Sequence, residues 1–285
     1  MRPDAASPKT VRLGETTQVR FSRESFKMLV HYICWICDDP RLLTQQKLNF
    51  IIWYADRHMY FETGQSITGA TYIKHQNGPR ARAMGAVLDE LQREGGLARR
   101  PASSWTDEQL LFALRRPVLD GFNAAQISLV DTTTRGVCYG EPLSAINRQA
   151  HDTVFRIAQV GEILPFFTVF AGRAREIGPE EIHWALRAVR MANKAGVGVD
   201  PGTASNGYRT AAIEGLFWHL NRDPAIGISV PGTELSWFIY KQAGFPPLAV
   251  PELTLLYRFD LGELIVGAIH CSDVASGFAD DQDLD

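Results

Sequence analysis

Apolar residues recur at helical spacing through the first third of the chain. One stripe, within residues 46–63, consists of Leu48, Ile51, Ile52, Ala55 and Met59. It predicts a helix with Thr44 as its N-cap and Gly64 as the left-handed residue just past its last turn. A second stripe consists of Met84, Val87, Leu88 and Leu91. It predicts another helix, which begins at Gly78-Pro79 with proline at its first position.

An earlier stripe over residues 22–37 predicts a helix with Ser22 as its N-cap and Asp38-Asp39-Pro40 as its stop. Two apolar helices that bury their faces against each other provide the start of an α-helical core. After Gly95-Gly96, the runs LARRP and LLFALRRP flank a polar turn and predict a β-hairpin. Helix, helix and hairpin together resemble a winged-helix arrangement.

The middle of the chain has weaker patterns. Residues 124–139 show no period and are expected to be irregular. A helix is predicted from Ser144 onward, and the apolar run ILPFFTVFAG (163–172) is expected to lie in the core or at a partner surface. Gly178-Pro179-Glu180-Glu181 predicts the start of a further helix, because proline and acidic residues favour the first turn.

Residues 194–207, KAGVGVDPGTASNG, are rich in turn-forming and small polar residues and carry no apolar period, which is typical of an interdomain linker. Beyond them, residues 208–219 predict a helix. The alternating runs LTLLYRF and ELIVGAIH, joined by Asp260-Leu261-Gly262, predict a second β-hairpin.

These patterns predict an α+β fold, in which a mainly α-helical N-terminal domain with a small wing-like β-hairpin precedes a small α+β domain with an antiparallel sheet. The expected divisions are a mobile tail (1–20), the N-terminal domain (21–193), the linker (194–207) and the C-terminal domain (208–285).

Composition adds limits. Of the 285 residues, 45% are hydrophobic and 21% charged, which is typical of a soluble globular protein with a core of its own. A net charge of −3 gives no broad basic field for nucleic acid or an anionic membrane. The first residues lack the apolar core of a signal peptide, and no segment has the apolar length of a membrane span. We therefore expect a cytoplasmic protein without membrane contact.

Four cysteines are present: Cys34, Cys37, Cys138 and Cys271. Cys34-x-x-Cys37 lies in an apolar run and has no second pair nearby, so we expect reduced core thiols and no metal site. Gly196-x-Gly198 has no strand before it and too little glycine after it for a dinucleotide loop, and no cofactor is expected.

A set of residues occurs in a fixed order from the region of the first stripe to the Gly78-Pro79 step: Lys47, Tyr54, Asp56, Gly64, Thr68, Gly69, Tyr72, Gly78 and Pro79. This order resembles the Panacea domain, the antitoxin domain of SocA-like proteins, which also occurs beside phage genes. The resemblance implies an interaction protein that neutralises unrelated toxins by binding them, or an adaptor that hands a toxin to a protease.

The series of a helix, Asp223-Pro224, an aromatic strand, Tyr257-Arg258 and a final apolar strand resembles the RelE/ParE toxin superfamily. That resemblance implies either cleavage of messenger RNA on the ribosome or binding of gyrase. The candidate catalytic residues are Tyr240, Lys241, Tyr257, Arg258 and His270. An acid–base pair with an electrophilic Arg or Lys would suit phosphodiester cleavage. We favour the alternative that the tyrosines are cross-strand aromatics that hold the sheet, and we assign no catalytic residue.

The winged-helix-like region contains six arginines: Arg80, Arg82, Arg99, Arg100, Arg115 and Arg116. Arginines in a helix and wing can bind DNA phosphates. Acidic residues in the same stretch nearly balance their charge: Asp89, Glu90, Glu94, Asp107 and Glu108. A solvated, partly ion-paired face is therefore the preferred interpretation, with nucleic-acid binding as an alternative.

The resulting interpretation is a toxin–antitoxin system protein, in which a Panacea-like antitoxin domain is fused to a toxin-like domain. The expected partner is a toxin in cis or in trans, with a protease or chaperone as a further partner. Phe166, Phe167 and Phe170 are expected to touch the toxin. The alternatives are an adaptor or phage-associated binding module without toxin activity, and an enzyme whose C-terminal domain cleaves RNA.

Overall fold

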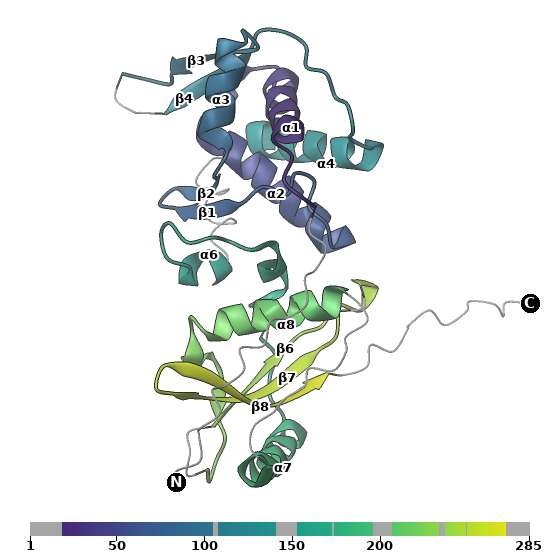
Figure 1. Ribbon diagram of the computed structural model, residues 1–285, viewed down its shortest axis with the longest axis vertical. Coiled ribbons are helices and arrows are strands. Elements are labelled where there is room, and N and C mark those ends of the chain that lie inside the picture. The colour runs from purple at the N-terminus through teal and green to yellow at the C-terminus, as the bar shows by residue number, and fades with distance from the viewer. Residues whose placement is uncertain are drawn as a thin grey trace, which may run out of the picture.

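The computed structural model describes residues 19–104, 108–140, 153–172, 174–195, 207–233, 237–248 and 250–271. Two parts follow each other along the long axis of the molecule (Figure 1). One is a helical part with two small hairpins, and the other is a four-stranded antiparallel sheet with a helix on each face. The fold is α+β, as the sequence predicts.

The helical part is built on four helices: α1 (Arg23–Ile36), α2 (Gln45–Thr63), α3 (Met84–Arg93) and α4 (Ala124–Arg135). A short 3₁₀ turn, η1 (Pro40–Leu42), joins the first two. The predicted caps are confirmed. The side chain of Ser22 accepts a hydrogen bond from the Ser25 N–H, and that of Thr44 accepts one from the Lys47 N–H. Gly64 ends α2 with a φ of 74°, a left-handed conformation that glycine adopts without a steric penalty.

Two antiparallel hairpins complete this part: β1 (Tyr72–His75) with β2 (Gly78–Ala81), and β3 (Leu97–Pro101) with β4 (Gln109–Ala113). The second is the predicted hairpin. The first corrects a prediction, because Gly78-Pro79 begins strand β2 and the next helix begins only at Met84. Gly78 has a φ of 126°, which no helix allows, and a Cβ there would lie 2.5 Å from the ring of Phe50.

Residues 124–139 correct a second prediction, since they form α4 and a following π-helical turn, η2 (Gly136–Gly140). The local signal for this helix is a capping box between Asn123 and Gln126 at its start. The hydroxyls of three successive threonines near its end donate hydrogen bonds to carbonyls of the preceding turn: Thr132, Thr133 and Thr134. Only a narrow face of α4 is buried, so its period is weak in the sequence.

Between the two parts lie α6 (Thr153–Ile157) and the 3₁₀ turn η3 (Phe166–Phe170). The helix predicted from Ser144 lies partly on residues 144–152, which are outside the described residues, and its last part coincides with α6. The predicted tail (1–20) and linker (194–207) also lie largely outside them, as does the chain after Cys271.

The C-terminal part contains α7 (Pro179–Ala195), α8 (Gly207–Leu220), and the strands β5 (Ile228–Ser229), β6 (Phe238–Gln242), β7 (Leu253–Asp260) and β8 (Glu263–Cys271). The 3₁₀ turns η4 (Pro224–Ile226) and η5 (Pro246–Leu248) lie before β5 and before β7. The strand order is β5-β6-β7-β8, and each pair is antiparallel. The predicted helix α8 and the predicted hairpin of β7 and β8 are both confirmed.

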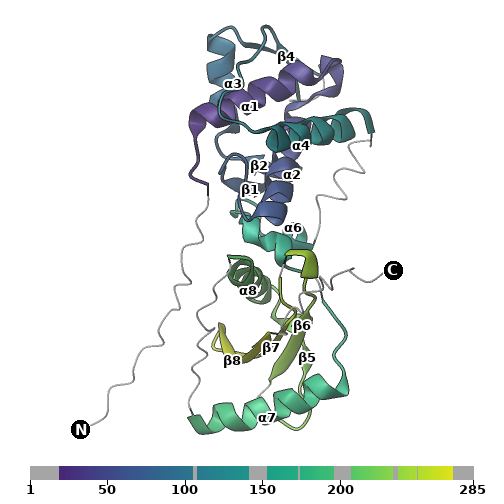
Figure 2. The ribbon, with the colours of Figure 1, turned by 90° about the vertical axis from the view of Figure 1, so that its right-hand side faces the viewer.

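The two faces of the sheet have different covers. Helix α8 lies on one face and α7 on the other (Figure 2). Beneath α7, a small apolar cluster joins Ala185 and Val189 to Trp237, Ile239 and Leu256 of the sheet part. The sequence-based boundary assigns α7 to the N-terminal domain, whereas its packing places it with the C-terminal sheet.

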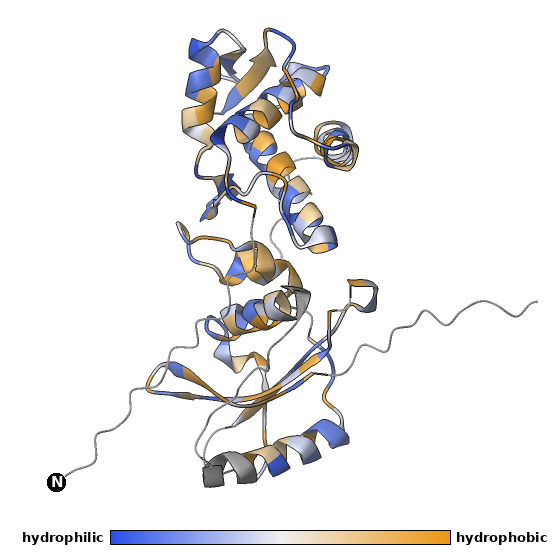
Figure 3. Cartoon of the chain, turned by 45° about the vertical axis from the view of Figure 1, so that its right-hand side comes forward, coloured by the Kyte–Doolittle hydropathy of each residue, from blue (hydrophilic) through white to orange (hydrophobic). Residues whose placement is uncertain are grey.

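The other face of the sheet belongs to the main core. A single apolar cluster runs from α1 and α2 through η3 to α8 and the inner sides of β6 and β7. Apolar residues line the strands between the two covering helices and continue upward into the helical part (Figure 3). The two parts therefore share one core. Among the described residues, no helix has the length and apolar character needed to cross a membrane.

Candidate functional site

Three of the motif residues that resemble the Panacea domain, Asp56, Thr68 and Tyr72, meet around one buried carboxylate. Asp56 of α2 is fully buried, and its oxygens accept hydrogen bonds from the Thr68 N–H (2.8 Å), the Thr68 hydroxyl (2.5 Å) and the Tyr72 hydroxyl (2.6 Å). The Thr68 hydroxyl in turn accepts from the Ala70 N–H at 3.0 Å. One side chain thus ties α2 to the loop that follows it and to the first strand.

Burial dominates the electrostatics of this cluster. It raises the pKa of Asp56 from 3.8 to about 6, although hydrogen bonds from Thr68 and Tyr72 favour the charged carboxylate and oppose the rise. Burial and the neighbouring carboxylate together raise the pKa of Tyr72 well above 10.0, so Tyr72 remains a hydrogen-bond donor throughout the physiological range.

The glycines of the motif allow close packing around the same unit. At Gly69, where φ is 65°, a Cβ would collide with the backbone of Val19. Because glycine has no Cβ, the chain before α1 can pass directly over Gly69. Gly78 leaves room for Phe50, and Pro79 pairs with Lys74 in the hairpin. These motif residues hold α2, β1 and β2 together rather than forming a catalytic group.

Tyr54 is the motif residue that reaches a groove. A hollow of about 510 Å³ lies between α2 and α4, beside η3. Its lining is largely aromatic and basic on α2 and short and polar on α4: Tyr54, Arg57, His58, Phe61, Leu129, Thr132, Thr133 and Val169. The sequence did not reveal this groove, because its second wall is the helix that the apolar pattern missed.

The candidate partner residues Phe166 and Phe170 lie at the junction between the two parts. Their rings lie 5.6 and 6.2 Å from the ring of Tyr60 on α2, and both side chains are buried. The carbonyl of Phe167 approaches α8 so closely that a Cβ on Gly215 would lie 2.8 Å from it. Turn η3 therefore fills the space between α2 of the helical part and α8 of the sheet part.

Polar contacts reinforce this junction. The guanidinium of Arg222, just after α8, binds the carboxylate of Glu162, just before η3. The Arg175 N–H donates to the Lys241 carbonyl at 2.9 Å, which connects the chain after η3 to the sheet. The rings of Phe61 and Phe245 lie 4.9 Å apart and form a further contact between the parts.

The five candidate catalytic residues do not form one site, because they lie on both faces of the sheet. Tyr240 and Tyr257 belong to the core beneath α8. Lys241 lies on the α7 face, where its ammonium binds Glu181 of α7 at 2.7 Å. Arg258 also lies on that face and stacks over Trp237 with 5.3 Å between the guanidinium carbon and the ring centre. His270 is there too, with its ring 6.1 Å from that of Trp184 on α7.

The protonation states of these residues also favour structural roles. Burial raises the pKa of Tyr240 and of Tyr257 to about 12, so neither hydroxyl is a base near neutral pH. Hydrogen bonding to Glu181 raises the pKa of Lys241 and lowers that of Glu181, which keeps both ions charged.

The two tyrosines provide a matched test. The Tyr257 hydroxyl donates to the Pro224 carbonyl (2.8 Å) and accepts from the Gly227 N–H (3.0 Å). The Tyr240 hydroxyl is buried and has no hydrogen-bond partner among the described residues. We expect Tyr257→Phe to lower the free energy of unfolding by roughly 1–2 kcal/mol and Tyr240→Phe to change it by less than about 0.5 kcal/mol. Urea unfolding of both variants measures this difference, and equal losses would contradict it.

Sequence reasoning missed His219 on α8. Its side chain is fully buried, and its ring lies 6.2 Å from that of Tyr240 in an edge-on arrangement. Burial lowers its pKa, which keeps the imidazole neutral. Nothing in the sequence around His219 distinguishes it from a surface histidine at the end of a helix.

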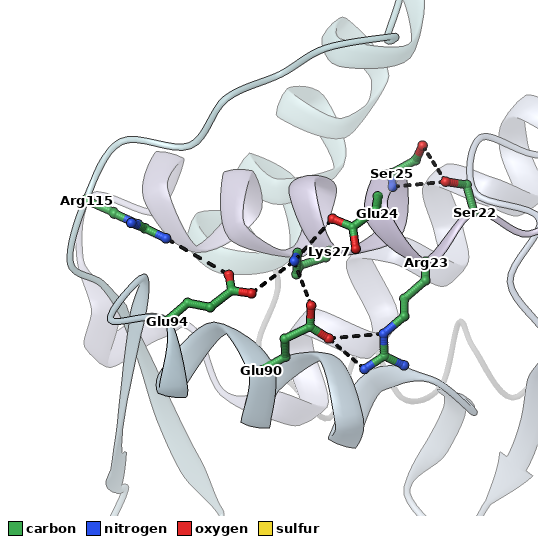
Figure 4. Close-up of polar contacts among 8 residues, drawn as sticks. All are labelled: Ser22, Arg23, Glu24, Ser25, Lys27, Glu90, Glu94 and Arg115. Carbon is green, nitrogen blue, oxygen red and sulfur yellow. Dashed lines mark hydrogen bonds and ion pairs between the residues drawn. The ribbon is translucent and has the colours of Figure 1, made fainter.

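The charged face of α1 and α3 is an ion-pair network (Figure 4). The ammonium of Lys27 on α1 binds Glu90 and Glu94 of α3 at 2.6 and 3.2 Å and Glu24 of its own helix at 3.1 Å. Arg23 binds Glu90 as well, at 2.7 Å. Hydrogen bonds from Lys27 and Arg23 lower the pKa of Glu90 to about 2.

The arginines that suggested DNA binding are partly engaged in the same way. Arg99 binds Asp89 at 2.7 Å, and Arg115 reaches Glu94 at 4.0 Å. Arg100 stacks over Phe112 of the neighbouring strand. Arg82 and Arg116 are exposed, and Arg80 is half-buried. This mixed-charge surface favours the interpretation of a solvated, ion-paired face over that of a phosphate-binding face.

The fold and the junction define an α+β protein whose helical part packs onto its own antiparallel sheet part through a buried aromatic turn. Comparison with protein families, curated proteins and solved structures gives no match for this chain.

Proposed function

We propose that this chain is a toxin–antitoxin-type interaction protein, in which the helical part acts as an antitoxin-like domain that binds and masks a toxin-like sheet part of the same chain. The observation that carries the proposal is the junction at η3. Phe166 and Phe170 are buried against α2, and the backbone at Phe167 packs against α8.

The residue order that resembles the Panacea domain supports the same proposal. Asp56, Thr68 and Tyr72 join α2, the following loop and β1 into one unit, and the Trp53 and Tyr72 rings of that unit lie 6.2 and 5.8 Å from the ring of Phe166. The motif therefore supports the surface on which η3 rests. A rigid, aromatic surface of this kind suits tight binding of a protein partner.

Covalent linkage would strengthen such masking. Two domains joined by a short flexible segment meet at an effective concentration on the order of millimolar. Helix α7 covers the opposite face of the sheet, which holds Lys241, Arg258 and His270, and it remains with the sheet part when the chain is cut before it. Release would then require the helical part to be displaced or the chain to be cut between η3 and α7.

Growth of bacterial cells tests the proposal. Three arms are compared: residues 174–285 induced alone, the full chain, and residues 174–285 induced together with separately expressed residues 1–172. A fragment that begins at residue 200 would lack α7 and expose Trp237, Ile239 and Leu256, so it is not a fair test. We expect residues 174–285 alone to arrest growth. We expect cells that express the full chain to grow normally, and co-expression of residues 1–172 to restore growth.

A folded 174–285 fragment without any effect on growth would contradict the toxin-like role. If growth does stop, the variants Lys241→Ala and Arg258→Ala distinguish the possible modes of action. Loss of arrest together with loss of RNA cleavage would assign a ribonuclease, whereas arrest without RNA cleavage would assign binding of a target.

The groove between α2 and α4 favours a second candidate function, that of an adaptor or binding module without toxin activity. Its aromatic and basic α2 wall and its volume of about 510 Å³ fit a short peptide segment of a partner protein. A harmless 174–285 fragment, combined with loss of partner binding on Tyr54→Ala, would assign this function instead.

A further inference from the structure

Two buried thiols that are far apart in the sequence meet where α1 ends and where the turn after α4 lies. Cys37 is the C-cap of α1, and Cys138 lies in the π-helical turn η2 after α4. Their sulfurs are 3.6 Å apart, although 101 positions separate the residues. A disulfide bond is about 2.05 Å long, so the two sulfurs need to approach by only about 1.5 Å.

We propose that Cys37 and Cys138 form a reversible disulfide in response to a peroxide, and that this bond locks α4 and its π-helical turn onto the end of α1. The site is independent of the proposed toxin–antitoxin role, since it lies in the helical part and uses none of the junction residues.

The surroundings of the two sulfurs divide the chemical roles between them. The sulfurs of Cys37 and Cys138 are hydrogen-bonded at 3.6 Å, and this contact together with the side chains of Tyr139 and Lys47 favours negative charge on Cys37, so the pKa of Cys37 is lowered. The pKa of Cys138 is raised by the same hydrogen bond and by burial. Cys37 is therefore the attacking thiolate and Cys138 the resolving thiol.

The reaction balances with hydrogen peroxide as the oxidant. The Cys37 thiolate attacks one peroxide oxygen, an S–O bond forms as the O–O bond breaks, and hydroxide leaves to give a sulfenic acid. The Cys138 sulfur then attacks the Cys37 sulfur, an S–S bond forms as the S–O bond breaks, and the departing hydroxide takes the Cys138 proton. Two thiols lose two electrons and two protons in total, and one peroxide becomes two waters.

The position of the pair explains how a small oxidant gains access. Cys37 follows the last residue of α1, and Cys138 lies in a π-helical turn beside the half-exposed Tyr139. Helix ends and irregular turns open at a lower free energy than a core does. Cys34, by contrast, lies inside α1, and burial raises its pKa, so it is the matched thiol that stays inert.

The bond would act on the groove described above. Helix α4 provides the wall with Leu129, Thr132 and Thr133, and η2 follows it directly. A covalent tie between η2 and α1 would restrain that wall against α2, whereas in the reduced protein only non-covalent packing on α1 and α2 holds it. The redox state of the pair would thereby set the rigidity of the groove.

The test uses the full chain, reduced and then treated with stoichiometric hydrogen peroxide. We expect two of the four thiols to disappear, a peptide map to show Cys37 linked to Cys138, and dithiothreitol to reverse the bond. Hydrogen exchange of α4 should slow at least about tenfold in the oxidised protein. The Cys34→Ala variant should form the same bond.

The variant Cys138→Ala isolates the first step. Its Cys37 should form a sulfenic acid that a dimedone-type reagent captures, whereas Cys37→Ala should leave Cys138 unmodified. Three results would overturn the proposal: linkage of Cys34 to either thiol, a dimer joined through Cys271, or folded protein whose thiols all survive while the urea-unfolded chain is oxidised. Thermal unfolding of each variant confirms that it is folded before treatment.

Discussion

Replacement of Asp56 by alanine is expected to lower the free energy of unfolding by roughly 3–5 kcal/mol, because each buried donor left without an acceptor costs about 1–3 kcal/mol. The Thr68 N–H, the Thr68 hydroxyl and the Tyr72 hydroxyl all donate to this one carboxylate. All three residues are buried, so water cannot replace the lost acceptor without opening the core.

Urea unfolding measures this loss. The matched control is Asp131→Ala, which removes the acceptor of another tyrosine hydroxyl, that of Tyr32, at 2.8 Å in a partly exposed position. Solvent can take over that acceptor role, and we expect a loss of about 1 kcal/mol or less. Equal losses at the two aspartates would show that the buried cluster does not organise α2 and β1.

The same cluster predicts a dependence of stability on pH. The folded-state pKa of Asp56 is about 6, above its ordinary value of 3.8. The folded protein therefore binds the proton more tightly than the unfolded chain does, and the stabilisation present below about pH 4 is lost as the pH rises through about 6. The loss is on the order of 3 kcal/mol. The variant Asp56→Asn lacks this titration, so its stability should not fall across that window. A fall of the same size in the variant would assign the effect to other groups.

Local signals in the sequence predicted much of the architecture. Helices α1 and α2 have both a wide apolar stripe and capping residues, Ser22, Thr44 and Gly64, whose interactions span only a few positions. The β7–β8 hairpin has two apolar runs rich in strand-forming residues and a short turn at Leu261-Gly262. Caps, apolar stripes and short turns each depend on residues that are close together in the sequence, so they can be recognised without knowledge of the fold.

The sequence-based predictions are wrong where the local structure depends on residues that are distant in the sequence. Gly78-Pro79 is compatible with a helix start or with a strand, and the ring of Phe50 decides between them by occupying the space above Gly78. Helix α7 has a clear start signal, but only the tertiary fold determines that it covers the sheet face holding Lys241. The proximity of Cys37 and Cys138 is of the same kind, since no local pattern connects them.

The candidate catalytic residues illustrate the same limit. Strand alternation correctly indicates that Tyr240 and Lys241 point to opposite faces. The same alternation separates Tyr257 from Arg258, but assigning the two faces to α8 and α7 requires the positions of both helices.

Replacement of Phe170 by alanine is the second change with a large expected effect. Its buried ring contacts those of Tyr60 and Phe61, at centroid distances of 6.2 and 5.7 Å, and removing it leaves a cavity at the junction. We expect the free energy of unfolding to fall by roughly 3–5 kcal/mol. The control Phe21→Ala removes a ring that is 40% exposed, and we expect a loss of less than about 1 kcal/mol. Urea unfolding compares the two, and similar losses would contradict the assigned importance of η3.

The most direct test of the central claim is to cut the chain between the two parts and ask whether they stay together. A protease site introduced at residue 173 allows the folded protein to be cleaved after η3 and before the Ala174–Gln242 bridge. The account predicts that residues 1–172 and 174–285 co-elute after cleavage, and that Phe170→Ala makes them separate. Separation of the wild-type halves into two folded proteins would show that the helical part does not bind the sheet part, and would contradict the account.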